Sequence, residues 1–168
     1  MGILPDSTTP PTARISDDVW LFYGKWGIGK TTLGASMAPD PSQVLIVSTE
    51  AGCKGLNVHT QPCHTRQDFL AIIHALKTEK HNFRTVVIDT VNVLRDQYEI
   101  ALCSEHGVAD PGERNDRGLL WRILRRDWTQ ALKLLGSLDM CVVLLAHEKQ
   151  IPVSVERGNK RVETGQVY

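Results

Sequence analysis

The segment GKWGIGKT at residues 24–31 limits the possible folds more than any other part of the sequence. It fits the pattern G-x-x-x-x-G-K-[ST], in which a glycine-rich turn follows a strand and opens a helix. The apolar run VWLFY directly precedes the segment, and a helical segment follows it. The pattern predicts a backbone cradle whose N–H groups point at phosphate oxygens.

Each position of this loop has an expected role. The glycines let the backbone curl, Lys30 is expected to reach the β- and γ-phosphates of a nucleotide, and the Thr31 hydroxyl is expected to bind magnesium. The predicted nucleotide-binding residues are Gly24, Lys25, Trp26, Gly27, Ile28, Gly29, Lys30, Thr31 and Thr32.

Three more apolar runs alternate with segments of helical periodicity. They are VLIVS at residues 44–48, TVVID at 85–89 and CVVLLA at 141–146. Continuous apolar runs are typical of strands that are buried on both faces of a parallel sheet. The alternation predicts an α/β fold, a three-layer α/β/α sandwich with a mostly parallel central sheet.

Helices are predicted after Thr65, after Thr90 and from about residue 117 to 135. Thr65 with Asp68 gives the first of them a start like a capping box. After the last strand, glycine and asparagine between two alternating runs predict a hairpin. The third helix is expected to bury a stripe made of Trp121, Leu124, Trp128, Ala131, Leu132 and Leu135.

Polar residues end or follow three of the predicted strands, on what should be one edge of the sheet. Asp89 is placed to hold magnesium, with capping of the next helix as the alternative. Glu50 is placed to act as general base on a water molecule, or to be a charge at a helix N-terminus. His147 is placed to sense the γ-phosphate as a hydrogen-bond donor, or to be structural.

Length and composition indicate an ordinary single domain. The chain has 168 residues and equal numbers of basic and acidic residues, 19 of each, so no global field favours a nucleic acid or a membrane. The sequence predicts a flexible leader over residues 1–17 and one domain over residues 18–168. The four cysteines lack close pair spacing and are expected to be reduced thiols. Without a signal peptide or a long apolar span, the protein is expected to be cytoplasmic.

The combined motifs resemble a RecA-type ATPase. VVIDTVNVL resembles the magnesium strand of that family, STEAG its glutamate segment, and residues 112–136 its first DNA-binding loop with the helix that follows. TEAGCKGL, TVVIDT, RRDW and AHEK make the chain similar to the small phage RecA-like proteins of the Sak group, which are single-strand annealing ATPases. A phage origin would place the protein in the host cytoplasm.

The resemblance implies ATP and Mg²⁺ as cofactors, Lys30, Glu50 and Asp89 as catalytic residues, and a phage-type recombination or annealing role. His147 is the fourth catalytic candidate and stands where RecA proteins usually have glutamine. The family core continues through more strands, so the domain is expected to be truncated or minimal. The two DNA loops correspond to about residues 106–117 and 149–165, which carry the candidate single-stranded DNA contacts Arg114, Arg117, Lys149, Arg157, Lys160 and Arg161.

The resemblance also implies a homo-oligomer in which neighbouring subunits share ATP sites. A cation from the neighbour completes such a site, and Lys160 or Arg161 is the candidate. No membrane partner is expected.

The sequence is also compatible with two other functions. Lys25 lies five residues before Lys30, as in dimeric partition and site-selection ATPases of the ParA and MinD type, although Trp26 replaces the first glycine of their signature. In the other alternative the chain is a non-hydrolysing nucleotide-binding interaction module.

Overall fold

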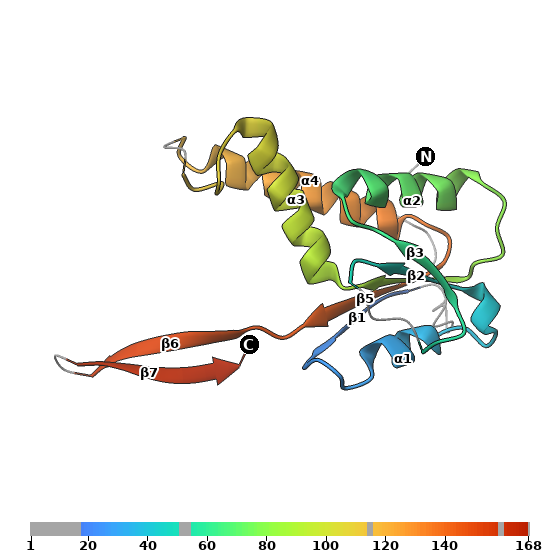
Figure 1. Ribbon diagram of the computed structural model, residues 1–168, viewed down its shortest axis with the longest axis horizontal. Helices are drawn as coiled ribbons and strands as arrows, with labels where there is room; N and C mark the ends of the chain where they lie inside the picture. Colours follow the sequence, from blue (N-terminus) through green and yellow to red (C-terminus); the bar gives the residue numbers. More distant parts are fainter. Residues whose placement is uncertain (1–17, 51–54, 114–115, 158–159, 168) are drawn as a thin grey trace, which may run out of the picture.

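The computed structural model describes residues 18–50, 55–113, 116–157 and 160–167, with side chains up to Lys149 (Figure 1). The leader predicted for residues 1–17 lies outside this part. The helices and strands in chain order are β1 (Val19–Gly24), α1 (Lys30–Ala35), the 3-10 helix η2 (Pro41–Gln43), β2 (Val44–Ser48), β3 (His59–Pro62), α2 (Arg66–Thr78), β4 (Thr85–Asp89), α3 (Val91–His106), α4 (Leu119–Gly136), β5 (Cys141–His147), β6 (Gln150–Arg157) and β7 (Lys160–Val167).

Five of the strands form one parallel sheet in the order β1-β5-β4-β2-β3. The register pairs Gly24 with His147, Asp89 with Leu145, and Ser48 with Asp89. Because parallel strands end at the same edge, this register brings the phosphate loop, Asp89 and His147 together. The predicted parallel sheet is confirmed.

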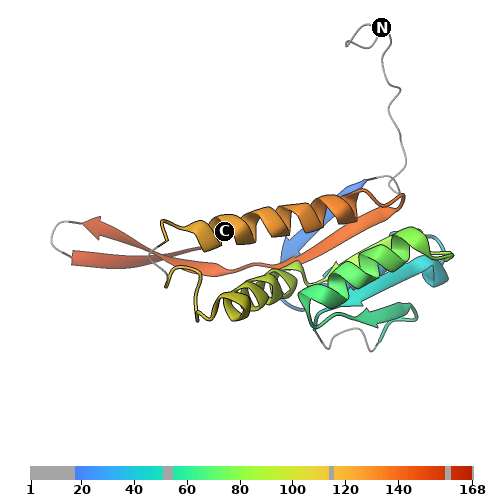
Figure 2. The same ribbon diagram turned by 90° about the horizontal axis from the view of Figure 1, so that it is seen from above.

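Helices cover both faces of the sheet, which confirms the three-layer α/β/α architecture (Figures 1 and 2). The short helix α1 lies on one face, and α2, α3 and α4 lie on the other. The helix α1 fits closely, since a Cβ added at Gly34 would lie 3.1 Å from a methyl group of Val87 on β4. The larger of two buried clusters lies under α2, α3 and α4, and the smaller faces α1.

The first strand is less buried than its sequence predicted. Val19, Leu21 and Tyr23 are 55%, 59% and 67% exposed, while Trp20 and Phe22 pack against the smaller buried cluster. The prediction of burial on both faces is wrong for β1 because the strand lies at an edge of the sheet. The opposite edge strand, β3, is short and exposed, and it was not predicted.

The third predicted helix forms α4 but begins at Leu119, after Arg117 and Gly118 with positive φ of 58° and 75°. Leu124, Ala131 and Leu135 of its predicted stripe are buried, and Trp128 and Leu132 are partly buried. Trp121 is 38% exposed, so the prediction that it is buried is wrong. It lies in the first turn, where the helix extends past the sheet (Figure 1).

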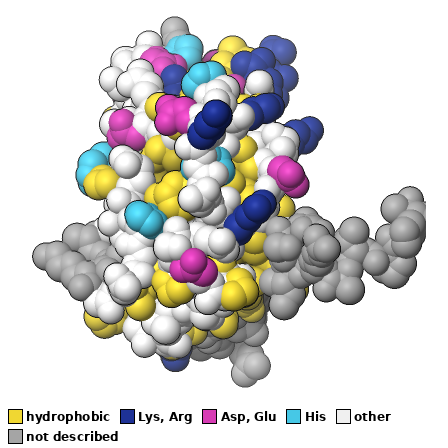
Figure 3. Space-filling view, turned by 90° about the vertical axis from the view of Figure 1, so that its right-hand side faces the viewer, with side chains coloured by type: hydrophobic (Ala, Val, Ile, Leu, Met, Phe, Trp, Pro, Cys, Tyr) yellow, Lys and Arg dark blue, Asp and Glu magenta, His cyan; other side chains and the backbone are white. Residues whose placement is uncertain are grey.

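The predicted hairpin is confirmed as the antiparallel pair β6 and β7, with Gln150 opposite Val167 and Arg157 opposite Lys160. It projects from the end of β5, at the carboxyl edge of the sheet (Figures 1 and 2). Figure 3 views the opposite end of the molecule, where apolar side chains are flanked by histidines and by charges of both signs. This mixture agrees with the balanced composition of the chain.

A capping box starts α2 as the sequence predicted. The Thr65 hydroxyl accepts a hydrogen bond from the Asp68 amide, and the Asp68 carboxylate accepts one from the Thr65 amide. Hydrogen bonds from the backbone of His64 and from Thr65 hold the pKa of Asp68 below its usual value. The stabilisation is therefore fully present above the pKa that Asp68 has in the unfolded chain. It is lost as the pH falls through the lower pKa that Asp68 has in the folded protein.

Replacing Thr65 with alanine is expected to lower the free energy of unfolding by about 1 kcal/mol, because it removes the acceptor for the Asp68 amide. Urea denaturation at pH 7 measures the change. The matched control is Thr78→Ala at the other end of the helix, whose hydroxyl donates to a carbonyl within the same helix. Equal stability losses in both variants would contradict the capping role.

Three cysteines, Cys63, Cys103 and Cys141, are buried free thiols, and Cys53 lies outside the described residues. Burial, together with the charge of Asp68, raises the pKa of Cys63 to about 11. Among the described residues, no helix is both long enough and apolar enough to cross a membrane.

Candidate nucleotide-binding site

The loop between β1 and α1 has the backbone of a cradle. Gly27 and Gly29 have φ of 77° and 90°, a region that favours glycine. A Cβ added at Gly24 would lie 2.6 Å from the terminal methyl group of Ile28, so the loop closes tightly over its first glycine. At Gly27 and Gly29 the backbone conformation favours glycine although a Cβ would meet no atom within 4 Å, whereas at Gly24 the space is also taken.

Lys30 is 8% exposed, and its ammonium group is held by the loop itself. Its Nζ donates to the carbonyl oxygens of Gly24 at 2.9 Å and Lys25 at 2.8 Å, and lies 3.3 Å from His147 Nδ1. A buried charge is costly unless it is paired or hydrogen-bonded, and these contacts meet that need. Phosphate oxygens entering the cradle would replace them.

Thr31 and Asp89 join the loop to the end of β4. Thr31 Oγ1 donates to Asp89 Oδ2 at 2.7 Å, across 58 positions of sequence, and Asp89 is 9% exposed. Magnesium prefers oxygen ligands and is usually held by one or two carboxylates together with substrate phosphates. Among the described residues no group of three or more histidine, cysteine or acidic side chains forms a metal cage. The pair therefore fits magnesium that arrives with a nucleotide.

Glu50 lies just beyond β2 and is oriented by the segment that follows β4. Thr90 Oγ1 donates to Glu50 Oε1 at 2.9 Å, and Glu50 Oε2 lies 3.8 Å from His147 Nε2. The Glu50 side chain is 39% exposed, so water reaches it. One carboxylate oxygen is fixed and the other faces the histidine, which is a suitable arrangement for accepting a proton from water.

Three positioning residues were missed by the sequence analysis. Thr49 donates its amide to the Asp89 carbonyl at 2.8 Å and accepts from the Thr90 amide at 2.7 Å. Asn92 accepts from the His147 amide at 2.9 Å. Thr49 precedes Glu50 and Thr90 follows Asp89, so their positions beside predicted site residues could have indicated their roles. Nothing in the sequence around Asn92 indicated its contact, because its partner His147 is 55 positions away.

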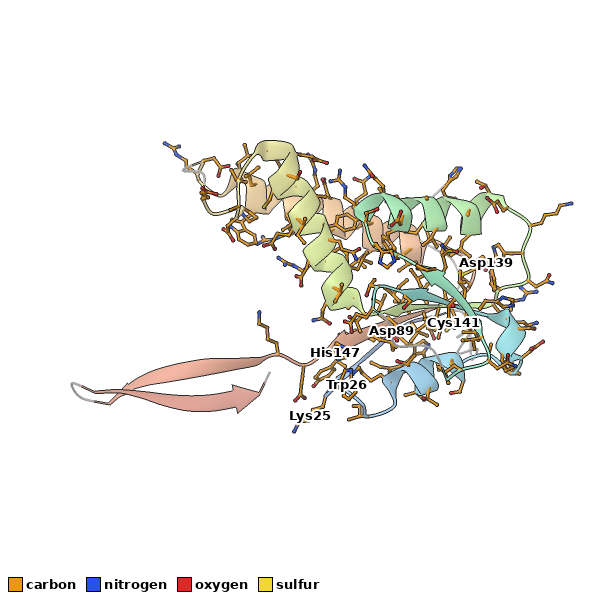
Figure 4. The ribbon with its side chains drawn as sticks, viewed as in Figure 1. Lys25, Trp26, Asp89, Asp139, Cys141 and His147 are labelled. Atoms are coloured by element: carbon orange, nitrogen blue, oxygen red, sulfur yellow. The ribbon has the colours of Figure 1, made fainter. Side chains whose placement is uncertain are left out.

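The phosphate loop and the strand-end residues Glu50, Asp89 and His147 line one cavity of about 450 Å³. Figure 4 shows Trp26 beside His147, and Lys25 directed away from the body of the domain. Trp26 is 84% exposed. The lining residues are Trp26, Gly27, Gly29, Lys30, Thr31, Thr32, Glu50, Gly55, Leu56, Asp89 and His147.

The amino-acid sequence matches the model of the AAA domain family over residues 18–166. The chain belongs to the AAA domain family. It is therefore a P-loop domain of the ATPase type, in agreement with the parallel sheet and the loop geometry. A comparison with curated proteins found no match.

The structure of this AAA domain brings the predicted catalytic residues together, and it describes the side chains of two of the six predicted DNA contacts. Lys30, Glu50, Asp89 and His147 share the cavity. Arg117 and Lys149 are exposed, on the segment before α4 and just after β5. Arg114 lies outside the described residues, as do the side chains of Arg157, Lys160 and Arg161, which belong to β6 and β7.

Proposed function

We propose that this AAA domain hydrolyses ATP with Mg²⁺ and couples hydrolysis to binding of single-stranded DNA, in phage-type recombination or strand annealing. The Thr31–Asp89 hydrogen bond carries the first half of the proposal, because it joins the phosphate loop to the acidic strand end beside Lys30 and Glu50. The resemblance of the ordered motifs to RecA-type proteins supports the second half.

The residues of the cavity divide the work of hydrolysis. Lys30 gives up its contacts with Gly24, Lys25 and His147 and neutralises the terminal phosphates. Thr31 and Asp89 would hold magnesium, which supplies positive charge at the phosphates when bound. The glycine cradle fixes the phosphate chain through backbone N–H groups.

Glu50 accepts the proton of the attacking water. The water oxygen forms a bond to the γ-phosphorus while the bond from that phosphorus to the ADP oxygen breaks. The hydrogen bond from Thr90 keeps the carboxylate oriented for this step. His147 is shared between Lys30 and Glu50, so it is placed to respond when a γ-phosphate draws Lys30 away.

Single-stranded DNA and a second copy of the chain are the proposed partners. Exposed Arg117 and Lys149 supply local positive charge for backbone contacts, which a chain of zero net charge needs. Lys160 or Arg161 on β7 is proposed as the cation that completes the ATP site of a neighbouring copy. Assembly would then raise the rate of hydrolysis.

Phosphate release by the full chain, with and without a single-stranded oligonucleotide, tests this function. We expect Mg²⁺-dependent turnover of ATP that increases when the oligonucleotide is added. An absence of turnover under every condition would refute hydrolysis and favour the non-hydrolysing interaction module. If ATP turnover is unchanged by the oligonucleotide and the oligonucleotide does not bind, only the nucleic-acid half of the proposed function is refuted.

A Lys25→Ala variant separates this proposal from a dimeric partition ATPase. We expect unchanged turnover, because Lys25 is exposed and is directed away from its own cavity (Figure 4). In a partition-type dimer the same lysine would reach the phosphates of the partner, and its loss would abolish dimer-dependent hydrolysis. Turnover measured over a range of protein concentrations distinguishes the two, with exposed Lys77→Ala as the control.

A further inference from the structure

A second cavity, of about 300 Å³, lies between α3 and α4, and we name it the α3–α4 pocket. Its walls combine two indole rings with two guanidinium groups. Its lining residues are Arg95, Trp121, Leu124, Arg125 and Trp128. Aromatic faces beside positive charges suit a ligand that is both flat and anionic.

The two tryptophans differ in how firmly they are held. Trp128 packs edge-on against Tyr98 with ring centroids 5.3 Å apart, and Tyr98 is 2% exposed, so this wall belongs to the core. Trp121 is 38% exposed despite its place on the core-facing stripe of α4. Its indole nitrogen lies near Gly112, since a Cβ added there would approach it to 3.5 Å. The open indole therefore borders the segment that joins α3 to α4.

The charges beside the pocket leave positive groups available. Arg95 is paired with Glu99 at 2.7 Å and with Asp96 at 3.5 Å. Within the described part of the chain, neither Arg122 nor Arg125 has an ion pair within 4.0 Å, and both are exposed. The α4 side of the rim is therefore positive, whereas on the facing segment the carboxylates of Asp110 and Glu113 accept hydrogen bonds within their own turn.

We propose that the α3–α4 pocket receives one base of single-stranded DNA, stacked on Trp121, with Arg125 and Arg122 contacting the flanking phosphates. This inference rests on the proposed function, which supplies the nucleic acid. The α3–α4 connection and the β6–β7 hairpin both extend from the carboxyl end of the sheet (Figures 1 and 2). A strand in the pocket would thus lie at the same end of the domain as the nucleotide site.

The placement supplies what the two predicted DNA loops lack. Neither loop segment, 106–117 or 149–165, contains a phenylalanine, tyrosine or tryptophan, so neither offers a large aromatic face for a base. Trp121 adds that face four residues after Arg117. Stacking of this kind accepts every base, because each has a flat face, and it therefore predicts binding without strong sequence preference.

The test compares a fluorescein-labelled dT oligonucleotide with an abasic oligonucleotide of equal length, using fluorescence anisotropy on the full chain. We expect wild type to bind the dT strand about tenfold more tightly than the abasic strand. Trp121→Ala should bind both strands equally. Leu134→Ala, which changes a 39% exposed side chain elsewhere on α4, should keep the wild-type difference.

The arginine contacts have a separate readout. Arg125→Gln should weaken binding of both strands and reduce the slope of log K against log salt by about one. Exposed Lys133→Gln on the same helix is the matched control. Thermal unfolding and binding of a fluorescent ATP analogue check that each variant is folded.

The outcomes separate the two proposals. If wild type binds DNA and Trp121→Ala keeps the preference for dT over abasic DNA, the pocket proposal is wrong and the proposed function stands. If wild type binds no DNA, both the pocket and the nucleic-acid half of the proposed function are wrong. If Trp121→Ala changes the oligomeric state of the protein and leaves DNA binding unchanged, the pocket is a protein interface and the proposal is overturned.

Discussion

Replacing Lys30 with alanine is expected to lower ATP turnover by on the order of 10²–10³-fold, and to weaken ATP binding as well. The ammonium group sits inside the phosphate cradle, held by two carbonyl oxygens of the loop. Its loss leaves the terminal phosphates without a positive group at that point. Phosphate release measures turnover, and titration with a fluorescent ATP analogue measures binding.

The control for this variant is Lys77→Ala, which removes an exposed lysine from the last turn of α2. Thermal unfolding of the Lys30 variant should show a folded protein, because the carbonyl groups released by the substitution can bond to water. Wild-type turnover in a folded Lys30→Ala protein would show that hydrolysis takes place elsewhere.

Glu50→Gln is expected to reduce turnover by about 10²–10⁴-fold while ATP binding is retained. The amide oxygen of glutamine can still accept the hydrogen bond from Thr90, so the side chain keeps its place. What it loses is the ability to take a proton from water. The comparison of single-turnover phosphate release with ATP affinity separates this effect from a loss of binding.

Glu79→Gln, at an exposed position just after α2, is the matched control and should behave as wild type. A Glu50→Gln protein that binds ATP and hydrolyses it at the wild-type rate would remove Glu50 from the mechanism. A variant that loses ATP binding instead would assign Glu50 to the nucleotide-binding role.

The parts of the site that the sequence predicted are those whose signals are local. The spacing of glycine and lysine in residues 24–31 predicts the phosphate cradle, and Asp89 ends an apolar run. Because parallel strands end at the same edge of a sheet, the contact between Thr31 and Asp89 could be predicted from these two signals. The hydrogen bonds of Thr49, Thr90 and Asn92 depend on side chains from separate strands and helices. Sequence spacing alone does not define such contacts.

Burial was harder to predict than secondary structure. A continuous apolar run correctly indicated β1, and apolar residues at helical spacing correctly indicated α4, but the exposure of Tyr23 and Trp121 depends on which elements cover them. β1 lies at an edge of the sheet, and Trp121 lies where α4 extends past the sheet (Figure 1). The short strand β3, with the sequence HTQP, has no apolar pattern and is specified by its pairing with β2.

The position of β1 affects how the nucleotide site responds to its ligand. In the described part of the chain, β1 pairs with β5 alone, whereas β4 is paired on both sides. Strands with fewer partners open more often, so backbone amides of β1 should exchange with solvent deuterium faster than those of β4. Because the phosphate loop leaves directly from β1, bound ATP should slow exchange in β1 more than in β4. Hydrogen–deuterium exchange by mass spectrometry would then report nucleotide occupancy through an edge strand of the sheet.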